Sequence, residues 1–305
     1  MKDMNIGGID AGKSRRLIYL IFFIILSIIF FITSIIFIIL YIKAINDSES
    51  DKKVKSVEPT IPEEPIPYQN PERYIKVLSR ITEEEGSFVK QGKHDFLNSK
   101  YFNYIDIYNT KSSGSLILLE KFKTYQQTSE YSCGIAALIM AVYYLDGTIL
   151  DETEMAKIAG SHEDDGTSME GLEKAISSLG YIYDSKLNYT DETSPSRDEE
   201  EFAKYIKDTL KNNESIIVSS NDWGGHYSVI IGYDDMGTED MSDDIIILAD
   251  PYDTSDHMSD GYTIFNYERY YAQMSIDIFG TEGWNLYFNT IKRKNKWIII
   301  IIIII

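Results

Sequence analysis

An uninterrupted apolar stretch near the N-terminus sets the first constraint on what this chain can fold into. Leu17 to Ile42 is 26 residues long and contains no charged side chain. As a helix it would extend roughly 39 Å, which is more than the ~30 Å hydrocarbon core of a bilayer. The exit from the stretch, Tyr41 to Asn46, lacks the small-residue cleavage pattern of a signal peptide. We therefore predict a short tail over residues 1–16 and a single transmembrane anchor over residues 17–42.

Basic residues around this stretch favour one orientation in the membrane. Lys13, Arg15 and Arg16 lie shortly before it, which favours a cytoplasmic N-terminus. Four lysines follow the stretch and reduce this bias: Lys43, Lys52, Lys53 and Lys55. We expect a single-pass membrane protein whose folded part lies on the extracytoplasmic side.

The composition changes several times along the rest of the chain. Residues 43–72 contain five closely spaced prolines and are predicted to form an extended spacer. Residues 73–115 are polar and leave open a short helix or a loop, whereas residues 116–291 carry the patterns of a folded domain. Residues 292–305 combine a basic cluster with eight isoleucines, a run too short to span a bilayer. Such a tail is typical of the start of a truncated second membrane segment.

The charge of the chain is strongly asymmetric. It has 29 basic and 48 acidic residues, and its net charge is −19. Residues 1–43 carry a net +3 and residues 291–305 a net +4, which leaves −26 on the part between them. A part this acidic repels phosphate backbones, so we expect no nucleic-acid partner. Basic peptides would be tolerated, although solubility alone is sufficient to explain the charge.

The supply of metal ligands is small. The chain has a single cysteine, Cys133, which excludes an internal disulfide and a zinc site built from several cysteines. Its four histidines show no metal-ligand spacing, and it contains no phosphate-binding Gly-Lys-Ser/Thr loop. We therefore expect no metal, no cofactor and no nucleotide.

Hydrophobic periodicity predicts helices in the first half of the domain and strands in the second half. A run of small and apolar residues indicates a buried helix over 133–145, and helical spacing recurs over 152–159, 168–179 and 198–211. Later segments are strand-like: 215–219, 226–233, 244–248 and 261–265. Helices followed by an antiparallel sheet indicate an α+β domain, in which a cleft between the two halves can hold an active site.

Cys133 is the first residue that can carry chemistry. If the buried helix begins there, the unpaired N–H groups and the positive end of the helix dipole favour its thiolate. Gly134 and the alanines after it leave little bulk around the sulfur, so that a substrate backbone can approach. The alternative is an inert core cysteine, which is the common fate of a solitary cysteine in an apolar run.

Among the four histidines, His226 has the context expected of a general base. It follows two glycines and opens an apolar strand that would hold its ring in place. The other three have weaker contexts, because His94 lies in a Lys-rich stretch and His162 and His257 lie in acidic loops. A hydrogen-bonded structural histidine remains the alternative.

Asp250 and Gln127 complete the candidate site. Asp250 ends an apolar strand before a proline, and beside His226 it would orient the imidazole and stabilise its protonated form. Asp-Pro is also a common way to open a turn. Gln127 lies six residues before Cys133, where its amide would join the Cys133 backbone N–H as a pair of donors for an oxyanion. A glutamine alone at this position is a weak signal, and another glutamine adjoins it.

The chain resembles family 39 of the cysteine peptidases in four motifs: Gln127-x5-Cys133-Gly134, Gly225-His226-Tyr227, Gly232-Tyr233-Asp234 and Asp250-Pro251. Members of that family are papain-like enzymes, best known as the double-glycine leader peptidases that process bacteriocins. The resemblance extends from about Leu116 to Met274. It implies a papain-like fold with a nucleophile, a general base, an orienting carboxylate and an oxyanion-hole residue, in that order: Cys133, His226, Asp250 and Gln127.

Two departures from the family pattern limit what the resemblance implies. An acidic insert, residues 236–244, separates His226 from Asp250, and we expect it to lengthen a hairpin without changing the site. The well-known members are fused to a transporter with a nucleotide-binding domain, whereas this chain resembles the stand-alone members. Cleavage after a double glycine is therefore not implied.

The predicted function is hydrolysis of a peptide bond by a membrane-anchored cysteine peptidase, through a thioester on Cys133. The expected partners are a peptide or protein substrate and the lipid bilayer. Two alternatives stay open. The same site would also support acyl transfer to an amine, and a papain-like domain without catalysis would serve as a peptide-binding module.

Overall fold

The computed structural model describes residue 33 and residues 71–81, 86–90, 100–101, 103–275 and 286–292. Apart from Thr33, these residues belong to one compact unit, Pro62–Ile305. The predicted anchor (apart from Thr33), most of the predicted spacer and the isoleucine tail lie outside the described residues. Within the part that is described, no helix has the length and apolar character needed to cross a membrane.

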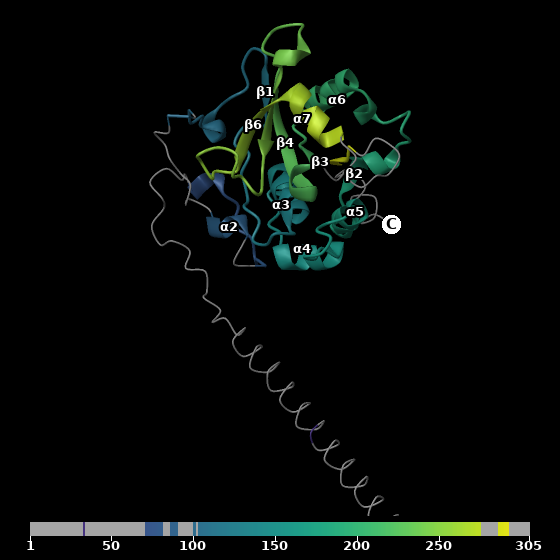
Figure 1. Cartoon of the computed structure of the whole chain (residues 1–305). Coiled ribbons are helices and arrows are strands. Elements are labelled where there is room, and N and C mark those ends of the chain that lie inside the picture. The colour runs from purple at the N-terminus through teal and green to yellow at the C-terminus, as the bar shows by residue number, and fades with distance from the viewer. Residues whose placement is uncertain are drawn as a thin grey trace, which may run out of the picture. The chain divides into compact units, whose positions relative to one another are not determined.

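Seven strands of the described residues form one antiparallel sheet (Figure 1). Its order is β2-β7-β3-β4-β5-β6, and β1 pairs with β4 beside this path. The strands are β1 (Leu116–Leu118), β2 (Ile182–Ser185), β3 (Ile216–Ser220), β4 (His226–Asp234), β5 (Ile245–Ala249), β6 (Tyr262–Asn266) and β7 (Phe288–Lys292). The four predicted strands correspond to β3 to β6, with ends that differ by at most one residue.

The α-helices among the described residues are α2 (Ser87–Lys90), α3 (Cys133–Asp146), α4 (Glu152–Ala159), α5 (Met169–Ser178), α6 (Glu199–Lys211) and α7 (Tyr267–Ser275). The helices α3 to α6 confirm the four predicted helices. Eleven residues of α3 are buried, including positions on every side of it. A helix that is apolar all round lies in the interior of a protein, and α3 is the central helix of the domain. The predicted α+β class with an antiparallel sheet is confirmed.

Helices cover both faces of the sheet. Phe288 of β7 packs on one face against Phe202 and Tyr205 of α6, with ring centroids 6.0 and 5.0 Å away. Successive residues of an extended chain point to opposite faces, so the neighbouring Tyr287 lies on the other face. There its ring contacts Tyr227 of β4, with centroids 6.0 Å apart. Tyr227 lies close to the start of α3, so α3 and α6 pack on opposite faces.

The strand β4 is paired along both of its edges. Residues 226–230 pair with β3, and residues 229–234 pair with β5. The register with β5 shifts between Ile230 and Gly232, which marks a β-bulge in the strand. The acidic insert forms the connection from β4 to β5, and pairing continues to Asp234 and Ile245 at its base. The insert therefore lengthens this hairpin, as predicted.

The sequence did not predict three of these strands and one of these helices: β1, β2, β7 and α7. The strand β7 lies between β2 and β3, so its polar residues Asn289 and Thr290 are buried. The segment Phe-Asn-Thr-Ile-Lys has no polar and apolar alternation, and its position in the sheet comes only from its two neighbours.

The beginning of the segment that the sequence left open packs on the same core. Ile75 is buried, and its backbone N–H donates to the carbonyl oxygen of Thr124 at 2.9 Å. Arg73 forms a buried ion pair with Asp260, in which Nη1 lies 2.9 Å from Oδ2. These two residues are 187 positions apart in the chain, so the ion pair joins the start of the domain to the loop before β6.

Gly171 lets α4 and α5 pack at short range. A Cβ atom at this position would lie 2.4 Å from the carbonyl oxygen of Ala159, the last residue of α4. We expect Gly171→Ala to destabilise the domain by about 1–3 kcal/mol, because a backbone atom must move to admit the methyl group. Thermal unfolding measures the effect, and Lys174→Ala at an exposed position of α5 is the matched control. Equal unfolding midpoints for wild type and Gly171→Ala would contradict this helix contact.

Candidate active site

Cys133 is the first residue of α3, as the sequence predicted. The residue is buried, with 7% of its surface exposed. Ser132 precedes it as the N-cap, but the serine hydroxyl makes no capping bond to the helix. The first turn of α3 therefore keeps N–H groups without a side-chain cap, and together with the helix dipole they favour negative charge on the sulfur.

Two glycines place His226 at the start of β4. Gly224 and Gly225 have φ angles of 86° and 130°, which L-residues with a side chain rarely adopt. They end a short turn after β3 and bring the chain back, so that His226 pairs with Ser220. The histidine is thus held at the end of a paired strand, and it is 4% exposed.

Asp250 directly follows β5 and contacts the His226 ring. Its Oδ1 atom lies 2.6 Å from Nε2 of His226 and accepts the backbone N–H of Tyr252 at 2.8 Å. The backbone N–H of Asp250 donates to the carbonyl oxygen of Gly261 at 2.9 Å. The carboxylate is therefore fixed from two sides, and it engages Nε2 of the imidazole.

The His226 ring joins this carboxylate to the thiol, because it is hydrogen bonded to both Asp250 and Cys133. Burial by itself would lower the pKa of the imidazole. The charge and hydrogen bond of Asp250, followed by the hydrogen bond and charge of Cys133, outweigh burial and raise the pKa of His226 from 6.5 to about 10. The ring therefore keeps its proton at neutral pH, and an imidazolium in this position stabilises a thiolate.

Two adjacent glutamines lie buried before Cys133, and they are bonded differently. The Nε2 atom of Gln126 donates to the carbonyl oxygen of Asp250 at 3.2 Å, and its Oε1 lies 3.2 Å from the Ser87 hydroxyl oxygen. The Nε2 atom of Gln127 donates to the carbonyl oxygen of Ser129 at 2.7 Å, while its Oε1 has no partner among the described residues. The amide of Gln126 thus has a polar neighbour at both ends, and that of Gln127 has one at its Nε2 end.

Ser87 is a residue of this region that sequence reasoning missed. Its hydroxyl donates to the carbonyl oxygen of Pro251 at 2.7 Å, and the backbone N–H of Gln127 donates to the same oxygen at 2.9 Å. These bonds tie the segment before Cys133 to the chain just after Asp250. Ser87 belongs to the polar stretch between residues 73 and 115, where no local pattern singles it out.

The packing around Gly134 differs from the expectation that small residues leave room for a substrate. A Cβ atom on Gly134 would lie 2.9 Å from the Cβ of Thr167, whose hydroxyl pairs with that of Ser161 at 2.7 Å. Ala136 and Ala137 are completely buried. The expectation was therefore wrong for these residues. Gly134 packs against the α4–α5 connection and the two alanines pack in the core, so their small size does not make room for a substrate.

The other described histidines lie in different surroundings. His162 is half exposed, and its ring nitrogens lie 3.8 Å from Asp164 and 3.4 Å from Asp165. His257 meets the ring of Tyr101 edge-on, with centroids 6.2 Å apart. His94 lies outside the described residues. Within the part that is described, no group of three or more His, Cys, Asp or Glu side chains is arranged to hold a metal ion.

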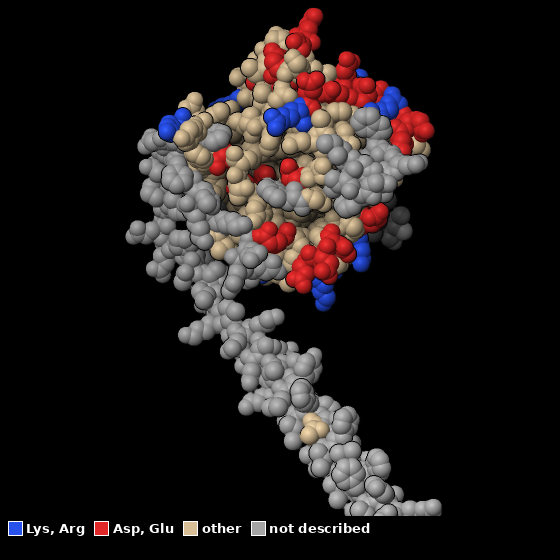
Figure 2. Space-filling model, in the orientation of Figure 1, with Lys and Arg blue, Asp and Glu red and all other residues tan. Residues whose placement is uncertain are grey.

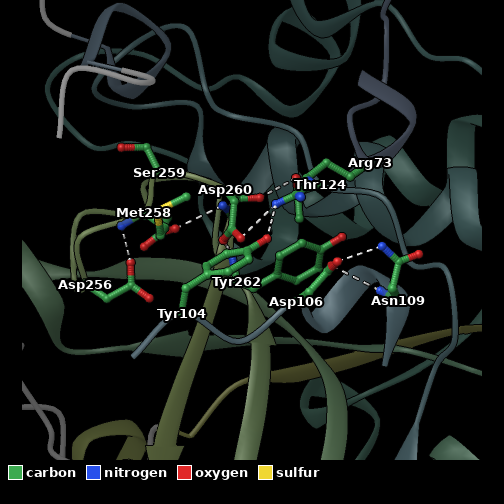
Figure 3. A network of polar contacts seen from close by, with 12 residues as sticks. Arg73, Tyr104, Asp106, Asn109, Thr124, Asp256, Met258, Ser259, Asp260 and Tyr262 are labelled. Atoms are coloured by element: carbon green, nitrogen blue, oxygen red, sulfur yellow. Dashed lines mark hydrogen bonds and ion pairs between the residues drawn. The ribbon is translucent and has the colours of Figure 1, made fainter. Parts of the chain in front are cut away.

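A buried polar network supports the loop between Asp250 and β6 (Figure 3). Arg73 contacts Asp260 and also donates to the Tyr104 hydroxyl at 3.0 Å. The Thr124 hydroxyl donates to the carbonyl oxygen of Asp260 at 2.9 Å, and the backbone N–H of Tyr262 donates to its Oδ1 at 3.1 Å. All polar atoms of the Asp260 side chain are therefore engaged, which fixes the end of the loop.

Asp253 is a second buried acid within this loop. Its Oδ2 accepts the backbone N–H of Gly261 at 2.9 Å. Burial, and then the charges of Asp256, Asp250 and Asp260, raise the pKa of Asp253 well above its ordinary value. Its neutral form is favoured because another negative charge beside the other acids would be costly in a buried place.

Acidic side chains gather over several parts of the face shown in Figure 2. They lie over the β4–β5 connection, over α6 and near α4. Exposed acids of these segments include Glu163, Asp164, Asp165, Glu200, Glu201, Glu239 and Asp240. The surface field on this side therefore attracts cationic groups.

The raised pKa of His226 leads to a direct test by NMR titration. Asp250→Asn should lower that pKa strongly, because burial would no longer be opposed by the carboxylate charge. Asp240→Asn, an exposed acid on the β4–β5 connection, removes the same charge and should change it little. The interaction between the His226 imidazolium and Asp250 stabilises the folded state fully below about pH 6.5. This contribution to the free energy of unfolding is lost as the pH rises toward about 10. An unchanged His226 titration in Asp250→Asn would contradict the assigned cause.

The folded part of the chain is similar to known proteins. Residues 119–277 match the model of the "Peptidase_C39 like family". One similar solved structure is the peptidase domain of Streptococcus ComA, described as a bi-functional ABC transporter involved in quorum sensing, at 17% identity and a TM-score of 0.35. That alignment covers 56% of this chain and 99% of the other.

A second is the peptidase domain of Streptococcus mutans ComA, at 16% identity and a TM-score of 0.29, covering 55% of this chain and 97% of the other. The comparison with curated proteins finds no match. The match to the family model extends over more than half of the chain and includes Cys133, His226 and Asp250. The chain belongs to the peptidase C39-like family, a family of cysteine peptidases.

Proposed function

We propose that this protein is a membrane-anchored cysteine peptidase that hydrolyses a peptide bond in a peptide or protein substrate. The observation that carries the proposal is the position of the His226 ring. It is hydrogen bonded to the only thiol of the chain on one side and to a buried carboxylate on the other. A thiol, an imidazole and a carboxylate in this order form the nucleophile, base and orienting group of a hydrolase.

In the first step Cys133 attacks the substrate. Since Nε2 of His226 engages Asp250, Nδ1 is the ring nitrogen that holds the thiol proton. The thiolate adds to the carbonyl carbon, and the C–N bond then breaks as Nδ1–H protonates the leaving amine. The products of this step are a free amine and a thioester on Cys133.

In the second step water completes the turnover. His226, now neutral, removes a proton from the water as its oxygen attacks the thioester carbonyl. The C–S bond breaks, the acid product leaves, and the imidazolium–thiolate pair is restored. Asp250 stays ionised throughout, because its role is to orient the ring and stabilise its positive charge.

Gln127 is the proposed oxyanion-hole residue. Its Nε2 atom uses one N–H on the Ser129 carbonyl oxygen, which leaves the other N–H for a substrate oxygen. The backbone N–H of Cys133, in the uncapped first turn of α3, would be the second donor. The loss of one such donor typically lowers the rate about a hundredfold.

The same active site supports a second reaction. If an amine and not water attacks the thioester, the product is a new amide and the reaction is an acyl transfer. A binding module without catalysis has less support, because thiol, imidazole and carboxylate are all present and bonded to one another.

Membrane attachment is supported by the sequence of the N-terminal part. The charge-free stretch from Leu17 to Ile42 is long enough to span a bilayer, and the basic residues before it favour a cytoplasmic N-terminus. We place the peptidase domain on the extracytoplasmic side of a single-pass protein. Its substrate would then be met outside the cytoplasm.

The peptidase proposal is tested by mass spectrometry of peptide mixtures incubated with the full-length chain. Cys133→Ala and His226→Ala should each abolish cleavage, because one removes the nucleophile and the other the base. His162→Ala, at a half-exposed histidine outside the site, is the matched control and should cleave like wild type. Cleavage that persists in Cys133→Ala would reject the proposal. Products heavier by an added amine would identify acyl transfer.

The anchor is tested by cell fractionation. A chain that lacks residues 1–42 should move from the carbonate-resistant membrane fraction to the soluble fraction, because the predicted spanning segment is gone. The full-length Cys133→Ala chain should stay with the membranes. A full-length chain found in the soluble fraction would reject the membrane anchor and leave the peptidase proposal unchanged.

A further inference from the structure

Glu152, at the start of α4, is a completely buried acid that the proposed mechanism does not use. Its carboxylate accepts hydrogen bonds from several groups of the segment before Cys133. Their donor atoms and distances are Tyr125 Oη at 2.8 Å, Thr128 Oγ1 at 2.5 Å, Thr128 N at 3.3 Å and Ser132 Oγ at 2.9 Å. A fifth, longer bond comes from the backbone N–H of Ile81 at 3.3 Å, and this N–H also donates to Oγ1 of Thr128 at 2.9 Å. Five donors converge on one side chain.

The pattern of donors favours a carboxylate over an amide at this position. Oε1 accepts from Thr128 N, and Oε2 accepts from Ile81 N. A backbone N–H can only donate, so both oxygens must be acceptors. A glutamine has one amide oxygen and one NH2 group, and in either orientation its NH2 would face a backbone N–H. The hydroxyl donors could reverse, but these two amides could not.

Glu152 is itself held firmly at the helix end. The Asp151 side chain caps α4 by accepting the N–H of Glu154 at 2.9 Å. The backbone N–H of Glu152 donates to the carbonyl oxygen of Ser79 at 3.3 Å. A negative charge in the first turn of α4 is also favoured by the helix dipole. The carboxylate is therefore a fixed point to which other segments attach.

The segment that it holds contains the proposed oxyanion-hole residue and ends at the proposed nucleophile. Thr128 adjoins Gln127, and Ser132 adjoins Cys133. Ser132 is the N-cap of α3, yet its hydroxyl turns to Glu152 and leaves the helix uncapped. The N–H groups of Gly134 and Ile135, which a serine cap would normally engage, thus have no capping side chain beside the proposed oxyanion donor, the N–H of Cys133.

We propose that Glu152 is a positioning residue of the active site, which fixes the segment Tyr125–Cys133 so that the thiol and the oxyanion donors keep their geometry. It acts through Thr128 and Ser132 and has no contact with the reacting atoms. The proposal rests on the proposed function, because it assigns a role within the same catalytic site.

The single cysteine allows a test that needs no known substrate. Iodoacetamide alkylation of the full-length chain, followed by intact mass, reports the reactivity of Cys133 alone. Wild type should be alkylated measurably at pH 6.5, because the protonated His226 ring lies beside the sulfur. Glu152→Gln should lower the alkylation rate at pH 6.5 at least tenfold, because a displaced Cys133 would lose its contact with the protonated His226 ring. Glu154→Gln, an exposed acid of the same helix, is the matched control and should react like wild type.

Two milder variants keep the test valid if Glu152→Gln does not fold. Ser132→Ala and Thr128→Val each remove one hydroxyl donor to the carboxylate and should fold, as judged by circular dichroism. Each should slow alkylation at pH 6.5 about threefold or more, and with a cleaved peptide each should lower kcat more than it raises KM. Lower thermal stability with an unchanged alkylation profile in these variants would overturn the proposal and leave Glu152 a purely structural residue.

The two proposals fail in different ways. If the His226→Ala chain is alkylated like wild type at pH 6.5 and no variant changes cleavage, the proposed function fails. If His226→Ala slows alkylation but the Glu152, Ser132 and Thr128 variants react like wild type, only the positioning role fails.

Discussion

The antiparallel pairing of β4 with β5 is the constraint on which the rest of this site depends. Because the two strands run in opposite directions, the first residue of β4 and the residue after β5 lie at the same end of this strand pair. At that end Nε2 of His226 lies 2.6 Å from Oδ1 of Asp250, although the two residues are 24 positions apart and an acidic hairpin connects them. Cys133, at the N-terminus of α3, lies beside His226 at the same end. The insert extends from the opposite end of the hairpin, and so it does not disturb the contact.

The segments around the site are held by buried polar groups whose removal would leave unpaired partners. Arg73 and Asp260 are buried as an ion pair, and Glu152 is buried with five hydrogen bonds. Buried charges add little net stability over apolar packing, but the loss of one partner is costly. Such groups instead favour the arrangement of the chain that satisfies their donors and acceptors, because a buried polar group without a partner is costly.

The start of the domain takes part in both of these arrangements. Residues 73–75 pair beside Thr124 and reach the loop before β6, while residues 79–81 contact Asp151 and Glu152 at the start of α4. Residues 73–81 therefore connect the loop after Asp250 to Glu152, whose carboxylate holds the segment before Cys133. The folded unit begins well before the first strand for this physical reason.

The sequence alone determined the elements whose patterns are local. The apolar run from Cys133 predicts α3, short strand-like segments rich in isoleucine, valine and tyrosine predict β3 to β6, and the glycines before His226 predict a turn. Cys133, His226, Asp250 and Gln127 were predicted as site residues from such contexts and from the resemblance to a peptidase family. These features are visible in a sequence because hydrophobic periodicity, turn residues and helix starts depend on neighbours in the chain.

Only the tertiary structure decided what depends on distant partners. The strand β7 exists because β2 and β3 flank it, and Gly134 is small because Thr167 packs on it. Glu152 looks like an ordinary first-turn acid of an amphipathic helix, and nothing near it in the chain announces its burial. Its role follows from Thr128 and Ser132, about twenty residues earlier, because a buried carboxylate is defined by the donors around it.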